Sequence, residues 1–150
     1  MLKKYQAHGI KAGMANDNSL NGGESENNSS NRCILVVEDN QDILLLTRSK
    51  LERAGYSVVT ASDGHEALTI FAKEPARFNL VIIDLMMPEM SGDTLALKLA
   101  EADAGVKILF MSGYAPDTVN NLQKLSHPVM AKPFTRNELL EQVEALTSKP

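Results

Sequence analysis

Five polar side chains stand where apolar segments of the chain stop. Glu38 and Asp39 follow one apolar run, Asp84 ends a second, and Ser112 and Lys132 follow two more. Three carboxylates gathered in one crevice repel one another strongly unless a cation lies among them. A set of oxygen ligands without His or Cys argues against zinc and favours Mg²⁺, which binds few carboxylates together with waters and phosphate oxygens.

A phosphoryl group would find complementary partners in the same set. Lys132 supplies a positive charge for phosphoryl oxygens, and Ser112 supplies a hydroxyl donor. Asp84 can then act as a nucleophile, as carboxylates do in phosphotransfer enzymes. Neutralising the charge on the transferring group is the main requirement of such a reaction. The residue types therefore predict phosphoryl transfer to Asp84 with the help of a divalent cation.

Plain structural roles are available for most of these residues. Asp84 alone could cap a following helix, and Glu38 with Asp39 could form a solvated turn before a helix capped by Asn40. Ser112 could bond only to backbone. The functional interpretation is favoured because the acids, the hydroxyl and the lysine fall at corresponding ends of four expected strands.

The segments that position these residues alternate between two periodicities. Continuous apolar runs at 33–37, 80–83 and 108–111 are typical of strands buried on both faces of a parallel sheet. A mixed segment at 56–59 and a short one at 128–130 suit the edges of that sheet. Between and after them lie five helical stripes of apolar residues. These are Leu44, Thr47, Leu51 and Ala54; Ala67, Ile70 and Phe71; Leu95, Leu99 and Ala102; Val119, Leu122 and Leu125; and Leu139, Val143 and Leu146.

Local signals agree with these boundaries. Gly55 stands where the first helix needs a left-handed cap. Two helix starts have N-cap to N3 spacing, Asp63 with Glu66 and Thr135 with Glu138. Five strands alternating with five helices predict an α/β fold with a doubly wound, five-stranded parallel sheet. Ligands bind such sheets beyond the carboxyl ends of the strands, where the candidate residues stand.

Composition narrows the class of protein. The 150 residues carry 15 Lys and Arg against 19 Asp and Glu, a net charge of −4. An acidic chain without a basic stripe is poorly suited to nucleic acid, and no apolar run approaches the roughly 20 residues that span a membrane. A single cysteine, Cys33, excludes an internal disulfide. We expect a cytoplasmic globular protein with neither a nucleic-acid nor a membrane partner.

The composition changes near residue 31. Residues 1–31 hold three lysines and three acids, and the stretch 16–31 is dominated by Asn, Ser, Gly and acids. Such a composition buries too little apolar surface to offset chain entropy. We therefore expect a disordered N-terminal leader over 1–31, and the whole net charge of −4 lies on a folded domain over 32–150.

Four segments resemble the signature regions of the response-regulator receiver domain of two-component systems. They are ILVVEDN, VIIDLMMPEMSG, FMSGYA and AKPFTRNEL. They have the order and spacing of that family over about residues 32–147. The residues of LMMPEMSG and MSGYA are most similar to those of receivers attached to, or partnered with, hybrid histidine kinases. The resemblance implies a receiver domain over 32–150 with the flavodoxin-like strand order 2-1-3-4-5.

The resemblance also implies a role for each site residue. Asp84 would be the phosphoacceptor, Asp39 would bind Mg²⁺ directly, and Glu38 would bind it through water. Ser112 and Lys132 would contact the phosphoryl oxygens. The phosphoryl group would come from a histidine kinase, a histidine phosphotransfer protein or a small phosphodonor. The domain would catalyse its own phosphorylation and slow dephosphorylation without being an enzyme in the metabolic sense.

Four further expectations follow from the family pattern. The backbone carbonyl of Met86 would complete the metal shell, and Lys132-Pro133 would be a cis peptide. Val129 occupies a position where the family often has a Tyr or Phe switch, so the usual aromatic readout is absent. Met86 and Tyr114 flank the path of an attacking water and orient it poorly, which predicts slow hydrolysis of the Asp84 phosphate.

Other functions compete with a phosphoacceptor module that signals by protein contact. A phosphorylation-independent pseudo-receiver or adaptor, or a receiver fragment of a hybrid histidine kinase, would share the fold. A phosphatase of the haloacid-dehalogenase type normally has a second Asp where Met86 stands. A flavodoxin should have a Ser, Thr and Gly-rich phosphate loop where Glu38 and Asp39 stand, and these acids would repel phosphate.

Overall fold

Five parallel strands form one sheet at the centre of the computed structural model, which describes residues 32–113 and 127–148. Their order across the sheet is β2-β1-β3-β4-β5, as the resemblance predicted. The bounds are β1 (Cys33–Val37), β2 (Ser57–Ala61), β3 (Leu80–Asp84), β4 (Ile108–Ser112) and β5 (Val129–Ala131). The chain moves outward from β1 in both directions, so the sheet is doubly wound.

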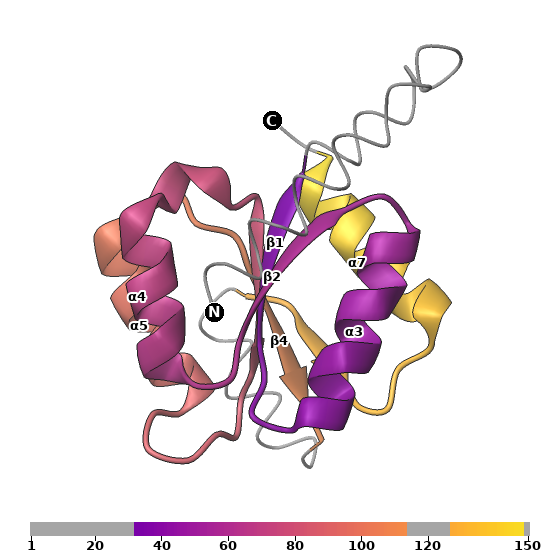
Figure 1. Ribbon diagram of the computed structural model, residues 1–150, viewed down its shortest axis with the longest axis horizontal. Helices are drawn as coiled ribbons and strands as arrows, with labels where there is room; N and C mark the ends of the chain where they lie inside the picture. Colours follow the sequence, from indigo (N-terminus) through magenta and orange to yellow (C-terminus); the bar gives the residue numbers. More distant parts are fainter. Residues whose placement is uncertain (1–31, 114–126, 149–150) are drawn as a thin grey trace.

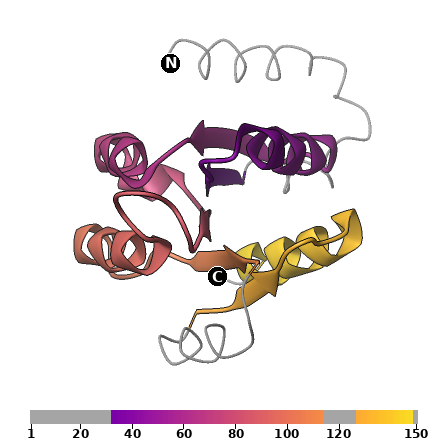
Figure 2. The same ribbon diagram turned by 90° about the horizontal axis from the view of Figure 1, so that it is seen from below.

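Helices cover both faces of the sheet. Within the described residues these are α3 (Gln41–Arg53), α4 (Gly64–Lys73), α5 (Gly92–Ala102) and α7 (Arg136–Thr147), with a 3₁₀ helix, η3 (Pro75–Arg77). Helices α4 and α5 lie on one face, and α3 and α7 lie on the other (Figures 1 and 2). The predicted helix containing Val119, Leu122 and Leu125 lies outside the described residues. The predicted α/β fold class is confirmed.

The sheet separates two hydrophobic cores. Alternate residues of one strand enter opposite cores, because side chains of a strand point to its two faces in turn. In β1, Leu35 faces α4 and α5, whereas Ile34 and Val36 face α3 and α7. Every residue of β1, β3 and β4 is buried. This burial explains why the central strands appear in the sequence as continuous apolar runs rather than alternating ones.

The edge strands differ from their predicted bounds. Strand β2 begins one residue later than expected, because the backbone N–H of Tyr56 bonds to the Leu51 carbonyl at the end of α3 instead of joining the sheet. Strand β5 begins after Pro128, which has no N–H to donate. The prediction that Ala102 faces the core is wrong, since this last residue of α5 is exposed beyond the final buried residue, Leu99.

The predicted turn and cap signals are present. Gly55 has a φ of 100°, the left-handed conformation that ends α3 without steric strain. Asp63 accepts a hydrogen bond from the Glu66 N–H, and Thr135 with Glu138 forms a complete capping box at α7. The Lys132-Pro133 peptide is cis, as predicted. None of the helices in the described part of the chain has the length and apolar character needed to cross a membrane.

Candidate functional site

Three carboxyl groups meet at one edge of the sheet. Glu38 and Asp39 directly follow β1, and Asp84 is the last residue of β3. Strands β1 and β3 are neighbours in parallel register, with Val37 opposite Ile83, so both end at the same edge. One carboxylate oxygen from each acid lies within 4.8 Å of the other two. The fold thus brings Asp84 next to Glu38, which precedes it by 46 positions in the sequence.

Lys132 reaches this group of acids from β5. Its Nζ donates to Glu38 Oε1 at 2.9 Å and lies 3.3 Å from Asp84 Oδ1. The backbone N–H of Lys132 donates to the Ser112 carbonyl at 2.8 Å, which continues the β4–β5 pairing by one residue. Ser112 is buried at the end of β4. All five candidate residues therefore stand at one edge of the sheet.

Burial distinguishes the three acids. Glu38 is 1% exposed and Asp84 is 5% exposed, whereas Asp39 faces solvent. Burial raises the pKa of Glu38 to about 7, and the neighbouring charge of Asp84 adds to the rise. Hydrogen bonds to the Glu38 carboxylate from the Asn40 N–H and from Lys132 oppose it. Removal of the Glu38 carboxyl from water, more than the charge of Asp84, therefore raises the pKa of Glu38.

The surroundings favour the neutral form of Glu38 but the charged form of Lys132. Burial disfavours its charged form, but the hydrogen bond to Glu38 and the negative charge of Asp84 outweigh burial, so the pKa of Lys132 is raised. One ammonium group then contacts two acids of a cluster of three, Glu38 and Asp84, which leaves an excess of negative charge. This all-oxygen group of ligands suits a hard divalent cation, and Mg²⁺ fits it.

Asn40 combines the two roles that were considered for this turn. Its side-chain Oδ1 accepts a hydrogen bond from the Ile43 N–H and caps α3. Its backbone N–H donates to Glu38 Oε2 at 3.0 Å. The helix cap and the position of the Glu38 carboxylate therefore depend on the same residue, so the structural and the functional interpretation of this turn are compatible.

The loop after β3 holds the remaining predicted residues. Met86 is 51% exposed, and its backbone N–H lies 3.4 Å from Asp84 Oδ1, whereas Met87 and Met90 are buried. Val129 is half-buried and packs against the core beneath α4 and α5. Tyr114 lies outside the described residues.

Gly92 is a site residue that the sequence analysis missed. A Cβ atom at this position would lie 2.5 Å from the backbone oxygen of Asp84 and 2.8 Å from Leu85 Cα. The first turn of α5 can therefore approach the end of β3 only because residue 92 has no side chain. The Ser-Gly pair before an apolar helical stripe was the available signal, although it does not reveal which backbone lies nearby.

Comparison with known proteins gives the family. Residues 34–144 match the family model of the response regulator receiver domain. The response regulator receiver protein CpdR of Brucella abortus is 34% identical over 115 residues, which cover 75% of this chain and 94% of CpdR. The probable transcriptional regulator ycf27 of Cyanophora paradoxa is 38% identical over 114 residues, which cover 75% of this chain and 47% of that protein. The chain spans about half the length of the transcriptional regulators it matches.

Solved structures agree with the sequence match. The response regulator TrrA of Thermotoga maritima, solved in complex with Mg²⁺–BeF, aligns with a TM-score of 0.70 and 32% identity. The alignment covers 77% of this chain and 98% of TrrA. The family model spans well over half of the chain, and the observed strand order is the one expected for the family. The chain belongs to the response regulator receiver domain family, the signalling module of two-component systems.

Proposed function

We propose that this protein is a phosphoacceptor module of a two-component system or phosphorelay. It accepts a phosphoryl group on Asp84 and signals through contacts with other proteins. The observation that best supports this function is the position of Lys132 Nζ, which contacts both Glu38 and Asp84 at the common edge of four strands. An Asp that only capped a helix would need neither a partly buried lysine nor two neighbouring acids.

In the proposed reaction the chain supplies the nucleophile. A carboxylate oxygen of Asp84 forms a bond to phosphorus, while the bond from phosphorus to the donor atom breaks. The donor atom is an imidazole nitrogen of a phosphohistidine or an oxygen of a small acyl phosphate, and it keeps the electron pair. Lys132 is already 3.3 Å from Asp84, so its ammonium can neutralise charge on the incoming phosphoryl oxygens. Ser112 would donate its hydroxyl hydrogen to one of them.

Four groups of this chain would hold the cation. They are the carboxylates of Glu38, Asp39 and Asp84 and the backbone carbonyl of Met86. The Mg²⁺–BeF complex of TrrA supports the choice of Mg²⁺, since that relative is 32% identical. When bound, Mg²⁺ would offset the charge of the carboxylates and of the phosphoryl oxygens. The exposed Asp39 would hold the cation on its solvent side, and the buried Glu38 would hold it on the side of the protein interior.

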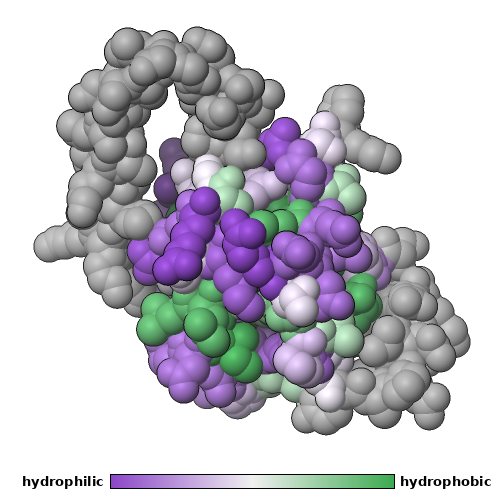
Figure 3. Space-filling model, turned by 90° about the vertical axis from the view of Figure 1, so that its right-hand side faces the viewer, coloured by the Kyte–Doolittle hydropathy of each residue, from purple (hydrophilic) through white to green (hydrophobic). Residues whose placement is uncertain are grey.

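The surface beside the site fits a protein donor. Leu45 and Leu46 on α3 are 53% and 59% exposed. On the side of the molecule formed by α3 and α7, apolar surface gathers in a patch (Figure 3). Leu46 also lines a small cavity of about 270 Å³ whose other walls include Phe134 and Lys132. Because Lys132 belongs to both the cavity and the acidic site, a partner docked on α3 would lie next to Asp84.

We therefore propose a histidine kinase or a histidine phosphotransfer protein as the donor, which would bury these leucines while it presents its phosphohistidine. The half-exposed Met86 at the edge of the site supports slow hydrolysis, because a thioether orients water poorly. A cytoplasmic location, a leader over 1–31 and a domain over 32–150 complete the proposal.

Mass spectrometry of the intact protein after incubation with acetyl phosphate and Mg²⁺ tests the phosphoacceptor. We expect the mass of one added phosphoryl group. The adduct should be absent in Asp84→Asn and in wild-type protein treated with a chelator. An unmodified wild-type chain that nevertheless binds Mg²⁺ would contradict the proposal and indicate a pseudo-receiver.

A second experiment tests the donor surface. Leu45→Ala and Leu46→Ala should slow transfer from a phosphorylated histidine phosphotransfer protein that labels the wild-type chain. Labelling by acetyl phosphate should remain unchanged, because the small donor does not need the surface of α3. Leu97→Ala is the matched control, since Leu97 is 60% exposed but lies on α5, on the opposite face. Equal slowing by all three variants would rule out a specific role for α3.

A further inference from the structure

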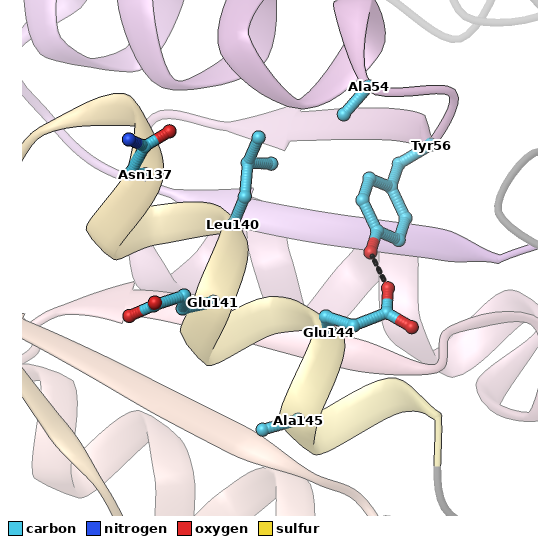
Figure 4. A pocket seen from close by; sticks show the side chains of 7 residues that line it. All are labelled: Ala54, Tyr56, Asn137, Leu140, Glu141, Glu144 and Ala145. Carbon is cyan, nitrogen blue, oxygen red and sulfur yellow. Dashed lines mark hydrogen bonds between the residues drawn. The ribbon is translucent and has the colours of Figure 1, made fainter.

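A second concave surface lies away from Asp84. It is a groove between the end of α3 and the outer side of α7 (Figure 4), with a volume of about 640 Å³. Its lining residues are Ala54, Tyr56, Asn137, Leu140, Glu141, Glu144 and Ala145. Ala54 ends α3 and Tyr56 precedes β2, so the groove lies toward the amino ends of the strands. The mechanism proposed for Asp84 does not use this surface.

The groove combines apolar walls with negative charge. Leu140, Ala54 and Ala145 supply apolar surface, and Glu141 and Glu144 stand about one turn apart on α7. No lysine, arginine or histidine occurs among the described residues that line it. A segment that combined positive charge with apolar side chains would complement both properties.

The chain enters the folded domain beside this groove. Arg32 immediately precedes β1, and its guanidinium donates to Glu144 Oε1 at 3.2 Å and to Thr147 Oγ1 at 3.3 Å. A basic side chain at the start of the domain is therefore already paired with an acid of the groove. The backbone of the preceding residues must therefore begin near this end of α7, because consecutive Cα atoms are about 3.8 Å apart.

The sequence upstream of Arg32 contains a segment of the required chemistry. Residues 1–14 include Lys3, Lys4 and Lys11, no acid, and the apolar residues Leu2, Tyr5, Ile10 and Met14. Residues 15–31 are mostly polar and contain all three acids of the first 31 residues. As a flexible linker, residues 15–31 would span about 20–25 Å, which is enough to reach along α7. A tether of this kind also keeps the local concentration of the segment near millimolar.

We propose that residues 1–14 dock in the groove between α3 and α7, with their lysines facing Glu141 and Glu144. The apolar residues of the segment cover Leu140 and Ala54. The contact continues the pairing that Arg32 already makes with α7. It involves no residue of the Asp84 site, so it stands or falls independently of the proposed phosphoryl transfer.

Paramagnetic broadening in the full chain tests this docking. An Ala7→Cys variant carries a nitroxide label, while the native Cys33 is buried and protected from labelling. We expect amide signals of 137–145 to lose most of their intensity, and those around Leu97 on the opposite face to keep theirs. Replacing Lys3, Lys4 and Lys11 by Glu in the labelled chain should restore the lost signals.

Charge reversal on the domain supplies a matched pair. Glu141→Lys should also restore the signals, whereas Glu101→Lys, at an exposed position of α5, should not. Broadening that is absent, or that spreads evenly over the surface, would overturn the proposal. So would equal broadening in a mixture of labelled chain and unlabelled, isotope-enriched chain, because the contact would then join two copies.

Discussion

The strand ends define two borders of the sheet: the carboxyl edge, where the strands end, and the amino edge, where they begin. Both carry acidic and basic side chains, but these differ in their exposure to solvent. At the carboxyl edge, Lys132 contacts Glu38 and Asp84, and both acids are nearly inaccessible to solvent. At the amino edge, Glu144 accepts hydrogen bonds from Arg32 at 3.2 Å and Tyr56 at 2.8 Å, but its side chain is 56% exposed. Each edge has acids paired with a base. Among the described residues, only the carboxyl edge places two buried acids on a single base.

This difference shows how burial separates a functional cluster from a structural one. Exposed pairs contribute little to stability, because water competes for both partners. Two buried acids that share a single base are costly, because one positive charge cannot fully offset both, and that cost can be recovered when a cation binds. We therefore infer that the amino edge slightly stabilises the folded state, whereas the carboxyl edge stores unfavourable electrostatic energy that a cation can relieve.

The largest expected effect is the loss of phosphorylation in Lys132→Met. Removing the ammonium that faces Asp84 should slow labelling by acetyl phosphate about 10²-fold or more, the usual cost of losing one group that stabilises developing charge. Lys107→Met is the control, since Lys107 Nζ donates to the Leu146 carbonyl at the end of α7. Initial labelling rates measure both. A Lys132→Met rate within about twofold of wild type would remove the functional distinction between the edges.

Backbone packing should be tighter around Gly92 at the carboxyl edge than around Gly105 at the amino edge. Gly92→Ala would place a Cβ atom 2.5 Å from the Asp84 carbonyl oxygen, so the backbone must move, at a cost of about 1–3 kcal/mol. Gly105 lies before β4, and the nearest atom to its added Cβ would be 3.7 Å away. Gly105→Ala should therefore be nearly neutral. Urea unfolding of both variants measures the difference, and equal losses would contradict a tighter carboxyl edge.

The same two edges show what a sequence can and cannot reveal. The continuous apolar runs of β1, β3 and β4 predicted the central strands, because burial on both faces leaves no polar position. Local signals also predicted the caps at Asp63 and Thr135. The edge strands were placed less well, since Tyr56 is buried without joining the sheet and Pro128 cannot donate to it.

Contacts between distant residues were harder to predict. The strand ends indicated that Asp84 and Lys132 share one edge, but not that Lys132 bonds to Glu38, 94 residues away. Nor did the sequence show that Gly92 touches the backbone of Asp84, because a glycine carries no mark of the atom that approaches it. The amino-edge contact of Tyr56 with Glu144 was likewise missed, since neither residue belongs to a motif.

A fall in pH should change the stability contributions of the two edges in opposite directions. Glu38 has a folded-state pKa of about 7, above its ordinary 4.5, so its contribution to stability is full below pH 4.5 and is lost as pH rises through 7. The hydrogen bond from Tyr56 lowers the pKa of Glu144, with Arg32 assisting, so its contribution is present above pH 4.5 and lost as pH falls further.

Thermal unfolding from pH 4 to 8 in the presence of a chelator separates these contributions. Glu38→Gln should gain stability relative to wild type near pH 8 and lose that advantage near pH 4. Glu144→Gln should be slightly less stable than wild type near pH 7, with the difference shrinking toward pH 4. If stability depends on pH in the same way in wild type and Glu38→Gln, the pKa of Glu38 is not raised in the folded state.

The smallest expected effect belongs to Tyr56→Phe at the amino edge. The change removes the hydroxyl that donates to Glu144 at 2.8 Å and keeps the buried ring. Because Glu144 is largely exposed, water can replace the lost donor, and we expect a loss of about 0.5–1 kcal/mol in urea unfolding. Adding Mg²⁺ should stabilise this variant as much as wild type, since the cation binds at the other edge. A larger loss, or a weaker response to Mg²⁺, would mean that the two edges are coupled through the sheet.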